Sequence, residues 1–282
     1  MKTRIILLAL VCIGFNAISQ TDSTSEIYLP GDSSIYKTDT IRIGNILIIR
    51  GKNENGEQAS IYRRKKIYTP TNISTNWGII DLGFSQVSDK TNYMQSIAGG
   101  LLPGGANEDW FNQRNFKSTN IDIWIFMQRL NILKHVVNLK YGVGGEFNNY
   151  KYTENIRFQK TGMPLVIMDN ISYRKNKLTA NYITVPMLLN FNFTPWIKHG
   201  FGLSAGVSAG YLYASKQKIN DGPEPGKVKY RDDFDLRKFK LAYIAELNLG
   251  PILLYASVGT QSMFEKALDQ TPVNFGIRLS SL

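Results

Sequence analysis

From Trp77 onward, polar and apolar side chains alternate along eight successive stretches of the chain. Successive side chains of a β-strand point to opposite faces, so each stretch predicts a strand with one apolar face and one polar face. The predicted strands are 77–87, 118–131, 136–152, 178–194, 200–216, 238–249, 252–263 and 272–281. This pattern predicts an all-β domain.

The connections between these strands alternate between two lengths. The long, polar connections are 88–117, 153–177, 217–236 and 264–271, and the short ones are 132–135, 195–199 and 250–251. An even number of strands, with both chain ends on the side of the short turns, is typical of barrels in the bacterial outer membrane. We therefore predict that residues 77–282 form an eight-stranded antiparallel transmembrane β-barrel in that membrane.

Alternation alone does not decide which face points inward, because a soluble ligand-binding barrel would place the same apolar side chains inside. Two features favour the membrane. The polar face is rich in Gly, Ser, Asn and Thr, which suit a narrow lumen, and aromatic side chains gather near the strand ends, as in interfacial girdles. The aromatic residues are Trp77, Phe193, Trp196 and Phe201 at the short turns, and Phe147, Tyr211 and Tyr213 at the long loops.

Some apolar residues fall on the polar face when positions are counted strictly. They are Trp124, Phe126, Leu188, Ile244 and Tyr255. Two explanations remain open: these side chains fill a closed lumen, or a β-bulge shifts the alternation.

The predicted lumen face also carries seven charged residues, namely Asp81, Asp122, Lys140, Glu146, Lys240, Glu246 and Arg278. They could line a path for ions or solutes. We favour a structural network that plugs the lumen, because an eight-stranded barrel is just wide enough for side chains to fill and buried charges need partners. Closure makes the first and last strands neighbours, so Asp81 and Arg278 are expected to pair.

The N-terminus has the features of an export signal. Lys2 and Arg4 precede an apolar run at 5–15 and small residues at 17–19, which predicts a signal peptide at 1–19. Cys12, the single cysteine, lies within it, so no disulfide or thiolate site is expected in the remainder. No later apolar run is long enough for a membrane-spanning helix.

Residues 20–76 are expected to form a periplasmic segment that is partly mobile. Stretches 41–49 and 61–68 could pair as a short β-hairpin around a turn at 51–56. The formal net charge of the chain is +11. For an exported protein, this excess favours outer-membrane lipid and lipopolysaccharide as partners over nucleic acid; scattered, solvated loop charges are the simpler interpretation.

The sequence offers little for catalysis. A lipid-modifying hydrolase would need a base beside its nucleophile, but the two histidines, His135 and His199, both fall in predicted periplasmic turns. There is no zinc-ligand spacing, phosphate-binding glycine loop or nucleophile elbow. We predict no catalytic, cofactor-binding or metal-binding residues, and keep a narrow pore, and less favourably a lipid-modifying enzyme, as alternatives.

Five stretches resemble the PorT-like outer-membrane β-barrel family. They are 39–44 (DTIRIG), 76–83 (NWG and DLG), 141–150 (YGVGGEFNNY), 182–189 (YITVPMLL) and 274–279 (NFGIRL). The resemblance implies a small non-catalytic barrel; the best-known member is associated with secretion and gliding machinery. Leu282 departs from the final aromatic common in such barrels. A structural role, or recognition of an envelope or secretion partner, is therefore expected. Trp110, Phe111 and Tyr230 are candidate loop contacts, with the alternative that such aromatic side chains fold back on the barrel rim.

Overall fold

The computed structural model describes residues 36–43, 46–53, 56–63, 69–114, 116–160, 162–197, 200–220 and 226–279. The chain divides into two compact units, Met1–Lys66 and Ile67–Leu282. The predicted signal peptide, His199 and Leu282 lie outside the described residues.

The first unit contains a three-stranded antiparallel sheet in the order β1-β2-β3. Its strands are β1 (Tyr36–Ile43), β2 (Ile46–Asn53) and β3 (Gly56–Arg63). Gly51, which the sequence suggested as the start of a turn, pairs with Gln58 inside this sheet. The stretch therefore holds three short strands in place of the expected two-stranded hairpin.

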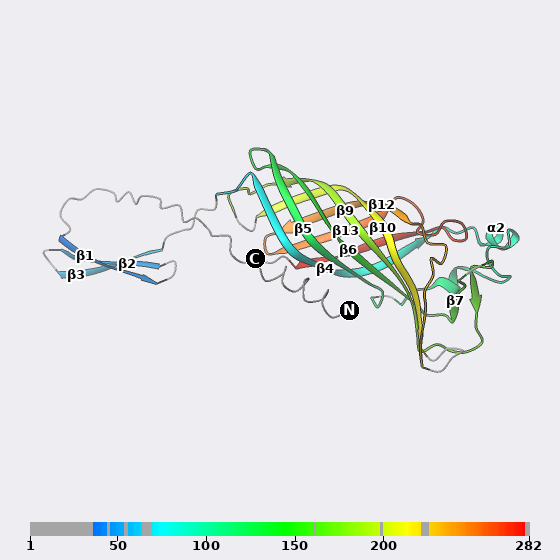
Figure 1. Cartoon of the computed structure of the whole chain (residues 1–282). Coiled ribbons are helices and arrows are strands. Elements are labelled where there is room, and N and C mark those ends of the chain that lie inside the picture. Colours follow the sequence, from blue (N-terminus) through cyan, green and yellow to red (C-terminus); the bar gives the residue numbers. More distant parts are fainter. Residues whose placement is uncertain are drawn as a thin grey trace, which may run out of the picture. The chain divides into compact units, whose positions relative to one another are not determined.

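The second unit is a closed ring of eight long antiparallel strands (Figure 1). They are β4 (Ile73–Asp89), β5 (Thr119–Leu133), β6 (Val137–Tyr152), β9 (Lys175–Asn192), β10 (Phe201–Asn220), β12 (Phe239–Leu249), β13 (Ile252–Gly259) and β14 (Gln270–Leu279). The order around the ring is β10-β12-β13-β14-β4-β5-β6-β9, and β9 pairs with β10 to close it. The predicted eight-stranded barrel is confirmed.

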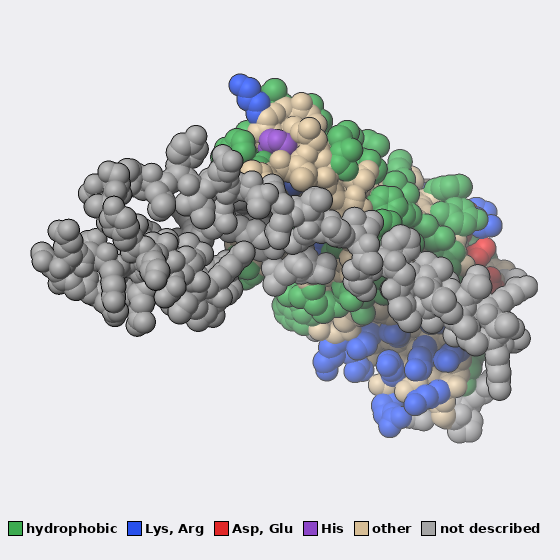
Figure 2. All heavy atoms as spheres, turned by 60° about the vertical axis from the view of Figure 1, so that its left-hand side comes forward, with side chains coloured by type: hydrophobic (Ala, Val, Ile, Leu, Met, Phe, Trp, Pro, Cys, Tyr) green, Lys and Arg blue, Asp and Glu red, His purple; other side chains and the backbone are tan. Residues whose placement is uncertain are grey.

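The apolar face of the strands points outward, as predicted. Exposed apolar side chains run along seven of the eight strands, for example Ile183, Val185 and Met187 on β9, and the outward side chains of β6 are partly exposed. Together they form an outward hydrophobic belt, part of which is seen on the face shown in Figure 2. The aromatic residues Trp77, Phe193 and Phe201 are exposed at the short-turn end. Because a soluble protein would bury these side chains, the arrangement fits strands in contact with lipid.

Irregularities in β4 and β5 explain one exception to the alternation. Gly78 adopts a positive φ of 64°, and the β5–β6 register shifts between Trp124 and Phe126. The shift turns Phe126 outward, where its ring lies 5.7 Å from that of Trp77, and turns Met127 into the buried lumen. Strict alternation would place Met127 on the lipid-facing side with Ile123, but the bulge reverses the alternation beyond it.

The other exceptions are apolar fillers of the lumen. Trp124, Leu188, Ile244 and Tyr255 keep their inward direction and are buried. On β10, glycine leaves room for the neighbouring strand: a Cβ atom on Gly206 would lie only 2.0 Å from the carbonyl oxygen of Met187. The lumen is thus filled by a few large side chains and narrowed where glycine lets the strands approach closely.

The long connections fold into a structure of their own at one end of the barrel, which we call the cap (Figure 1). Its elements are α2 (Tyr93–Ala98), the 3-10 helix η1 (Glu108–Phe111), β7 (Ile156–Phe158), β8 (Val166–Met168) and β11 (Lys227–Tyr230). The cap shares one hydrophobic core with the adjoining strand ends. Sequence reasoning had treated these connections as simple polar loops. No helix in the described part of the chain is long and apolar enough to cross a membrane.

Candidate functional site in the barrel lumen and the cap

The most extensive ion network in the lumen joins the first and last strands of the barrel. Arg278 on β14 lies opposite Asp81 on β4, and its Nε and Nη2 atoms donate hydrogen bonds of 2.7 and 2.8 Å to the two carboxylate oxygens of Asp81. Its Nη1 lies 2.5 Å from Glu246 Oε1 on β12, and Lys140 on β6 contacts the other oxygen of Glu246. The expected pair of Asp81 and Arg278 is therefore formed, within a four-residue network.

A second network surrounds Glu146 on β6. Lys240 on β12 forms an ion pair with Glu146 Oε1. Asn148 and Asn274 donate to the same oxygen at 2.8 and 3.1 Å, and Thr184 donates to Oε2 at 3.2 Å. These donors come from β6, β9, β12 and β14, so one buried carboxylate ties together strands from opposite sides of the ring.

Asp122 on β5 differs from the other six charged residues. It lies between Asp81 and Glu146 in the strand register, and its oxygen accepts a hydrogen bond of 2.8 Å from Asn120. No cation forms an ion pair with it among the residues that the structure describes. The lumen face therefore holds three neighbouring carboxylates, of which Asp81 and Glu146 have cationic partners.

The structure places all seven predicted charged residues in the lumen and joins six of them in ion pairs. Sequence reasoning missed the neutral side chains that complete the networks. Trp124 Nε1 donates to Asp81 at 2.7 Å, and Tyr255 donates to Asn120. Asn120 and Asn274 could have been found, because they also lie on the predicted polar face.

The cap has a packed core centred on Phe158. The centroid of its ring lies 6.0 Å from the ring centroids of Phe234 and Phe264, and 5.8 Å from that of Tyr152. Gln217 on β10 supports this core, because it accepts a 2.9 Å hydrogen bond from the backbone N–H of Phe158 and donates one of 2.9 Å to the carbonyl of Ile156. The cap is therefore anchored to the long extension of β10.

An ion pair at the edge of the cap joins β7 to the residue after β8. Arg157 donates to both oxygens of Asp169, at 2.8 and 3.2 Å, and the Tyr173 hydroxyl contacts the same carboxylate. Burial alone would raise the pKa of Asp169, but these hydrogen bonds outweigh it and lower the pKa. Asp169 therefore stays ionised and holds the two short strands together.

The loop aromatic residues proposed as partner contacts are largely occupied within the cap. Phe111 is buried and its ring stacks 6.0 Å from that of Tyr93, so the expectation that it contacts a partner was wrong. Trp110 and Tyr230 are partly buried against the same core. The loop aromatic residues thus fold back into the cap, which is the alternative that the sequence left open.

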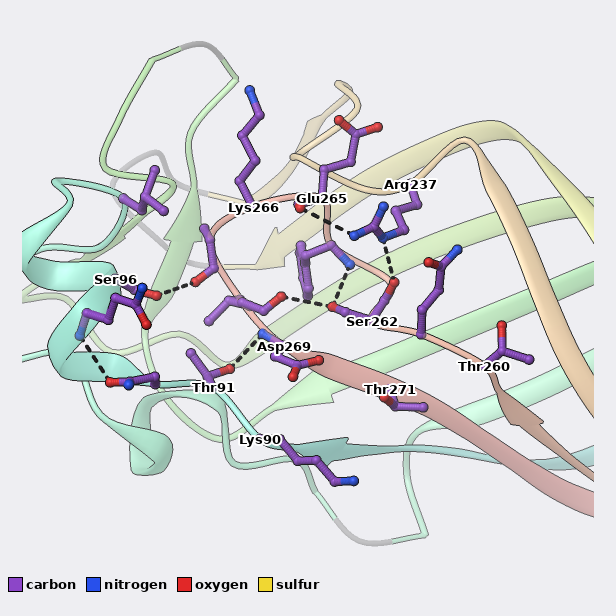
Figure 3. A pocket seen from close by; sticks show the side chains of 17 residues that line it. Lys90, Thr91, Ser96, Arg237, Thr260, Ser262, Glu265, Lys266, Asp269 and Thr271 are labelled. Atoms are coloured by element: carbon purple, nitrogen blue, oxygen red, sulfur yellow. Dashed lines mark hydrogen bonds between the residues drawn. The ribbon is translucent and has the colours of Figure 1, made fainter.

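A surface pocket of about 700 Å³ lies between the start of α2 and the β13–β14 connection (Figure 3). Many of its polar groups bond to one another: Ser96 donates to the Ala267 carbonyl at 3.0 Å, and Arg237 donates to the Ser262 carbonyl at 3.1 Å. These bonds join α2 and the segment just before β12 to the β13–β14 connection. The lining contains no histidine or cysteine.

His135 does not line this pocket and lies in the β5–β6 turn. Its ring lies 6.2 Å from that of Trp196 in the next short connection. Among the described residues, no group of three His, Cys, Asp or Glu side chains could hold a metal ion.

A comparison with protein-family models agrees with this architecture. Residues 126–258 match the family model described as "Outer membrane protein beta-barrel domain". Among solved structures, the chain is similar to Ail, the attachment invasion locus protein of Yersinia pestis, solved in complex with the heparin analogue sucrose octasulfate. The identity is 13% and the TM-score 0.29, over 73% of this chain and 97% of that chain. A search of the curated proteins gave no match.

The closed eight-stranded ring, its outward apolar belt and the family match define an outer-membrane β-barrel protein. The protein is located in the bacterial outer membrane. Barrels of this class have short periplasmic turns and longer external loops, so we expect the short-turn end to face the periplasm and the cap to face the exterior.

Proposed function

We propose that the protein is a non-catalytic barrel whose lumen serves as a structural plug and whose cap binds another component of the cell envelope. The observation that carries the proposal is the pairing of six of the seven lumen charges within the barrel. A path for solutes needs polar groups that remain free to exchange partners. Here those groups bond to each other.

The plug has a physical rationale. Removing charges from water is costly unless each finds a partner and its other hydrogen bonds are satisfied. The networks around Glu246 and Glu146 meet this condition, and together they link β4, β6, β9, β12 and β14. We infer that the lumen charges hold the barrel in one geometry.

Steady ion conductance is expected to be absent when the purified protein is inserted into planar lipid bilayers. The reason is that Trp124 and the paired charges fill the lumen. Single-channel recording measures this directly, with a general porin in the same bilayer as the control. Reproducible conductance steps from the barrel would contradict the plug and favour the narrow pore.

The cap supports a recognition role because its own core gives it a defined shape. Met94 on α2 is 83% exposed, and methionine is a flexible, polarizable side chain that is used often at adaptable binding surfaces. The resemblance to the PorT-like family favours a partner in an envelope or secretion assembly. We propose that the exposed side of α2 contributes to that contact.

A photo-cross-linking residue at Met94 should capture the same envelope protein in repeated experiments on living cells. The same residue at Leu241, an exposed position on the lipid-facing side of β12, is the matched control and should capture lipid only. Mass spectrometry of the adducts identifies what is bound. Adducts that are identical at both positions, or none at Met94, would contradict recognition through α2.

A further inference from the structure

Four lysines lie side by side across four neighbouring strands where these strands extend beyond the barrel. Lys151 on β6 pairs with Lys177 on β9, Lys177 pairs with Lys218 on β10, and Lys218 pairs with Lys229 on β11. Neighbouring strands are about 4.8 Å apart, so the row places four like charges at strand spacing. Three more lysines each lie two positions before a member of the row on the same strand, namely Lys175, Lys216 and Lys227. We call these seven residues the lysine face.

The lysine face continues the lipid-facing surface of the barrel. On β9, Lys177 has the same parity as the exposed residues Ile183 and Val185. On β10, a register shift between Leu212 and Ala214 reverses the alternation. As a result Gln217 turns into the cap core, while its neighbours Lys216 and Lys218 stay on the outer side. Figure 2 shows Lys and Arg side chains gathered beside the hydrophobic belt.

The depth of the lysine face matches the outer headgroup layer. Lys151 lies four positions after Phe147, on the same face of β6, and Phe147 belongs to the predicted outer aromatic girdle. A strand tilted by about 40° gains roughly 10 Å in height over four residues. The polar region of a bilayer extends about 5–8 Å beyond the hydrocarbon on each side. The backbone of the row therefore lies at the outer edge of the polar region, and the long, flexible lysine side chains can reach back from there to the phosphates of the outer leaflet.

The charge of the lysine face is not neutralised by the described part of the protein. The stretches 149–152, 175–179, 216–220 and 227–230 contain no acidic residue, and no lysine of the face takes part in an ion pair between described residues. Asp221 and Glu224 lie in the β10–β11 connection, outside the described residues. Lys177 donates a 2.7 Å hydrogen bond to a neutral partner, Asn149.

The lysines of the face repel one another. Burial, and then repulsion from Lys175 and Lys216, lowers the pKa of Lys177 to about 8. Repulsion from Lys175 is the main cause that lowers the pKa of Lys218. A bound anion would relieve this repulsion, because an opposite charge favours the protonated form of each lysine.

We propose that the lysine face binds the phosphate groups of lipopolysaccharide in the outer leaflet. Lysine is a good phosphate ligand because its ammonium group acts as a compact charge with three donors. The face adjoins the apolar belt, so a lipid whose acyl chains lie against Ile183 and Tyr211 brings its phosphates to the row. A soluble polyanion would lack this second contact. This inference rests on the orientation of the barrel in the membrane and is independent of the partner proposed for α2.

The test measures lipid binding to the full-length protein purified free of lipopolysaccharide. Native mass spectrometry compares diphosphoryl lipid A with dephosphorylated lipid A that carries the same acyl chains. We expect the wild-type protein to bind the phosphorylated form at least tenfold more tightly. The variant K151Q/K177Q/K218Q/K229Q should lose most of this preference, while K151R/K177R/K218R/K229R, which keeps the charges, should retain it.

A control variant removes four exposed lysines elsewhere: K90Q/K134Q/K238Q/K266Q. It lowers the net charge equally and should keep the preference within twofold. An equal loss in this control, or equal binding of the two lipids by the wild-type protein, would overturn the proposal. Displacement of lipid A by a soluble sulfated polysaccharide, without preference between the two lipids, would overturn it in favour of a soluble polyanion. The Met94 cross-link reports the α2 contact separately, so the two ideas can fail independently.

Discussion

Replacing Arg278 by methionine should lower the free energy of unfolding by about 3–5 kcal/mol, because removal of one partner leaves a buried charge uncompensated. Arg278 is the only cation that forms an ion pair with Asp81 among the described residues, and the side chains of this pair are 4% and 1% exposed. Glu246 keeps Lys140 in the variant, so the main loss falls on Asp81. Urea unfolding of the barrel in lipid vesicles measures the change.

The Arg157–Asp169 pair provides a matched control with the same chemistry. It is also an arginine that donates to both oxygens of an aspartate, but its side chains are 30% and 13% exposed. Partly exposed pairs contribute about 0–1 kcal/mol, so Arg157→Met should have a small effect. The double variant Arg278→Met with Asp81→Asn should recover part of the loss. Equal effects of the two arginine replacements would show that burial of the Arg278 pair is unimportant.

Replacing Phe158 by alanine should open the cap while the barrel remains intact. Phe158 is 1% exposed and its ring lies near three other aromatic rings. Loss of a fully buried phenylalanine costs about 3–5 kcal/mol. Because the barrel strands have their own hydrogen-bond ladders, the loss should remain local. Hydrogen exchange should show reduced protection at Ile156–Phe158 and Val166–Met168, with little change in Val137–Asn148.

Ile171→Ala is the control for Phe158→Ala, since Ile171 lies in the same connection but is 48% exposed. It should leave protection of β7 and β8 unchanged. If Phe158→Ala instead destabilised the whole barrel, the cap and the barrel would form a single cooperative unit. If it changed nothing, the aromatic cluster would contribute little to the order of the cap.

The barrel could be predicted from the sequence because its signal is local. Alternation over ten or more residues is repeated eight times, and the lengths of the connections fix which strand ends share a side. The pairing of Asp81 with Arg278 followed from closure of the ring, with both residues at similar depth. The resemblance to the PorT-like family, the domain boundaries and the partner remain predictions.

The features that could not be predicted depend on contacts between distant segments. The register shift at Phe126 is visible in the sequence only as a break in alternation, which a lumen filler would produce equally well. The cap core joins residues from four connections that have no periodic pattern of their own. For this reason the sequence does not decide whether Phe111 is an exposed contact or folds back. The alignment of the lysine row depends on the register shift near Ala214 and could not be predicted either.

Closure of the ring has a consequence for biogenesis. Asp81 lies on the first strand of the barrel and its cation, Arg278, on the last. Until the final strand docks, the carboxylate has no guanidinium to neutralise it, and an unfinished sheet would carry this cost into the bilayer. We therefore expect a chain that lacks β14 to insert into the bilayer less favourably than the complete chain.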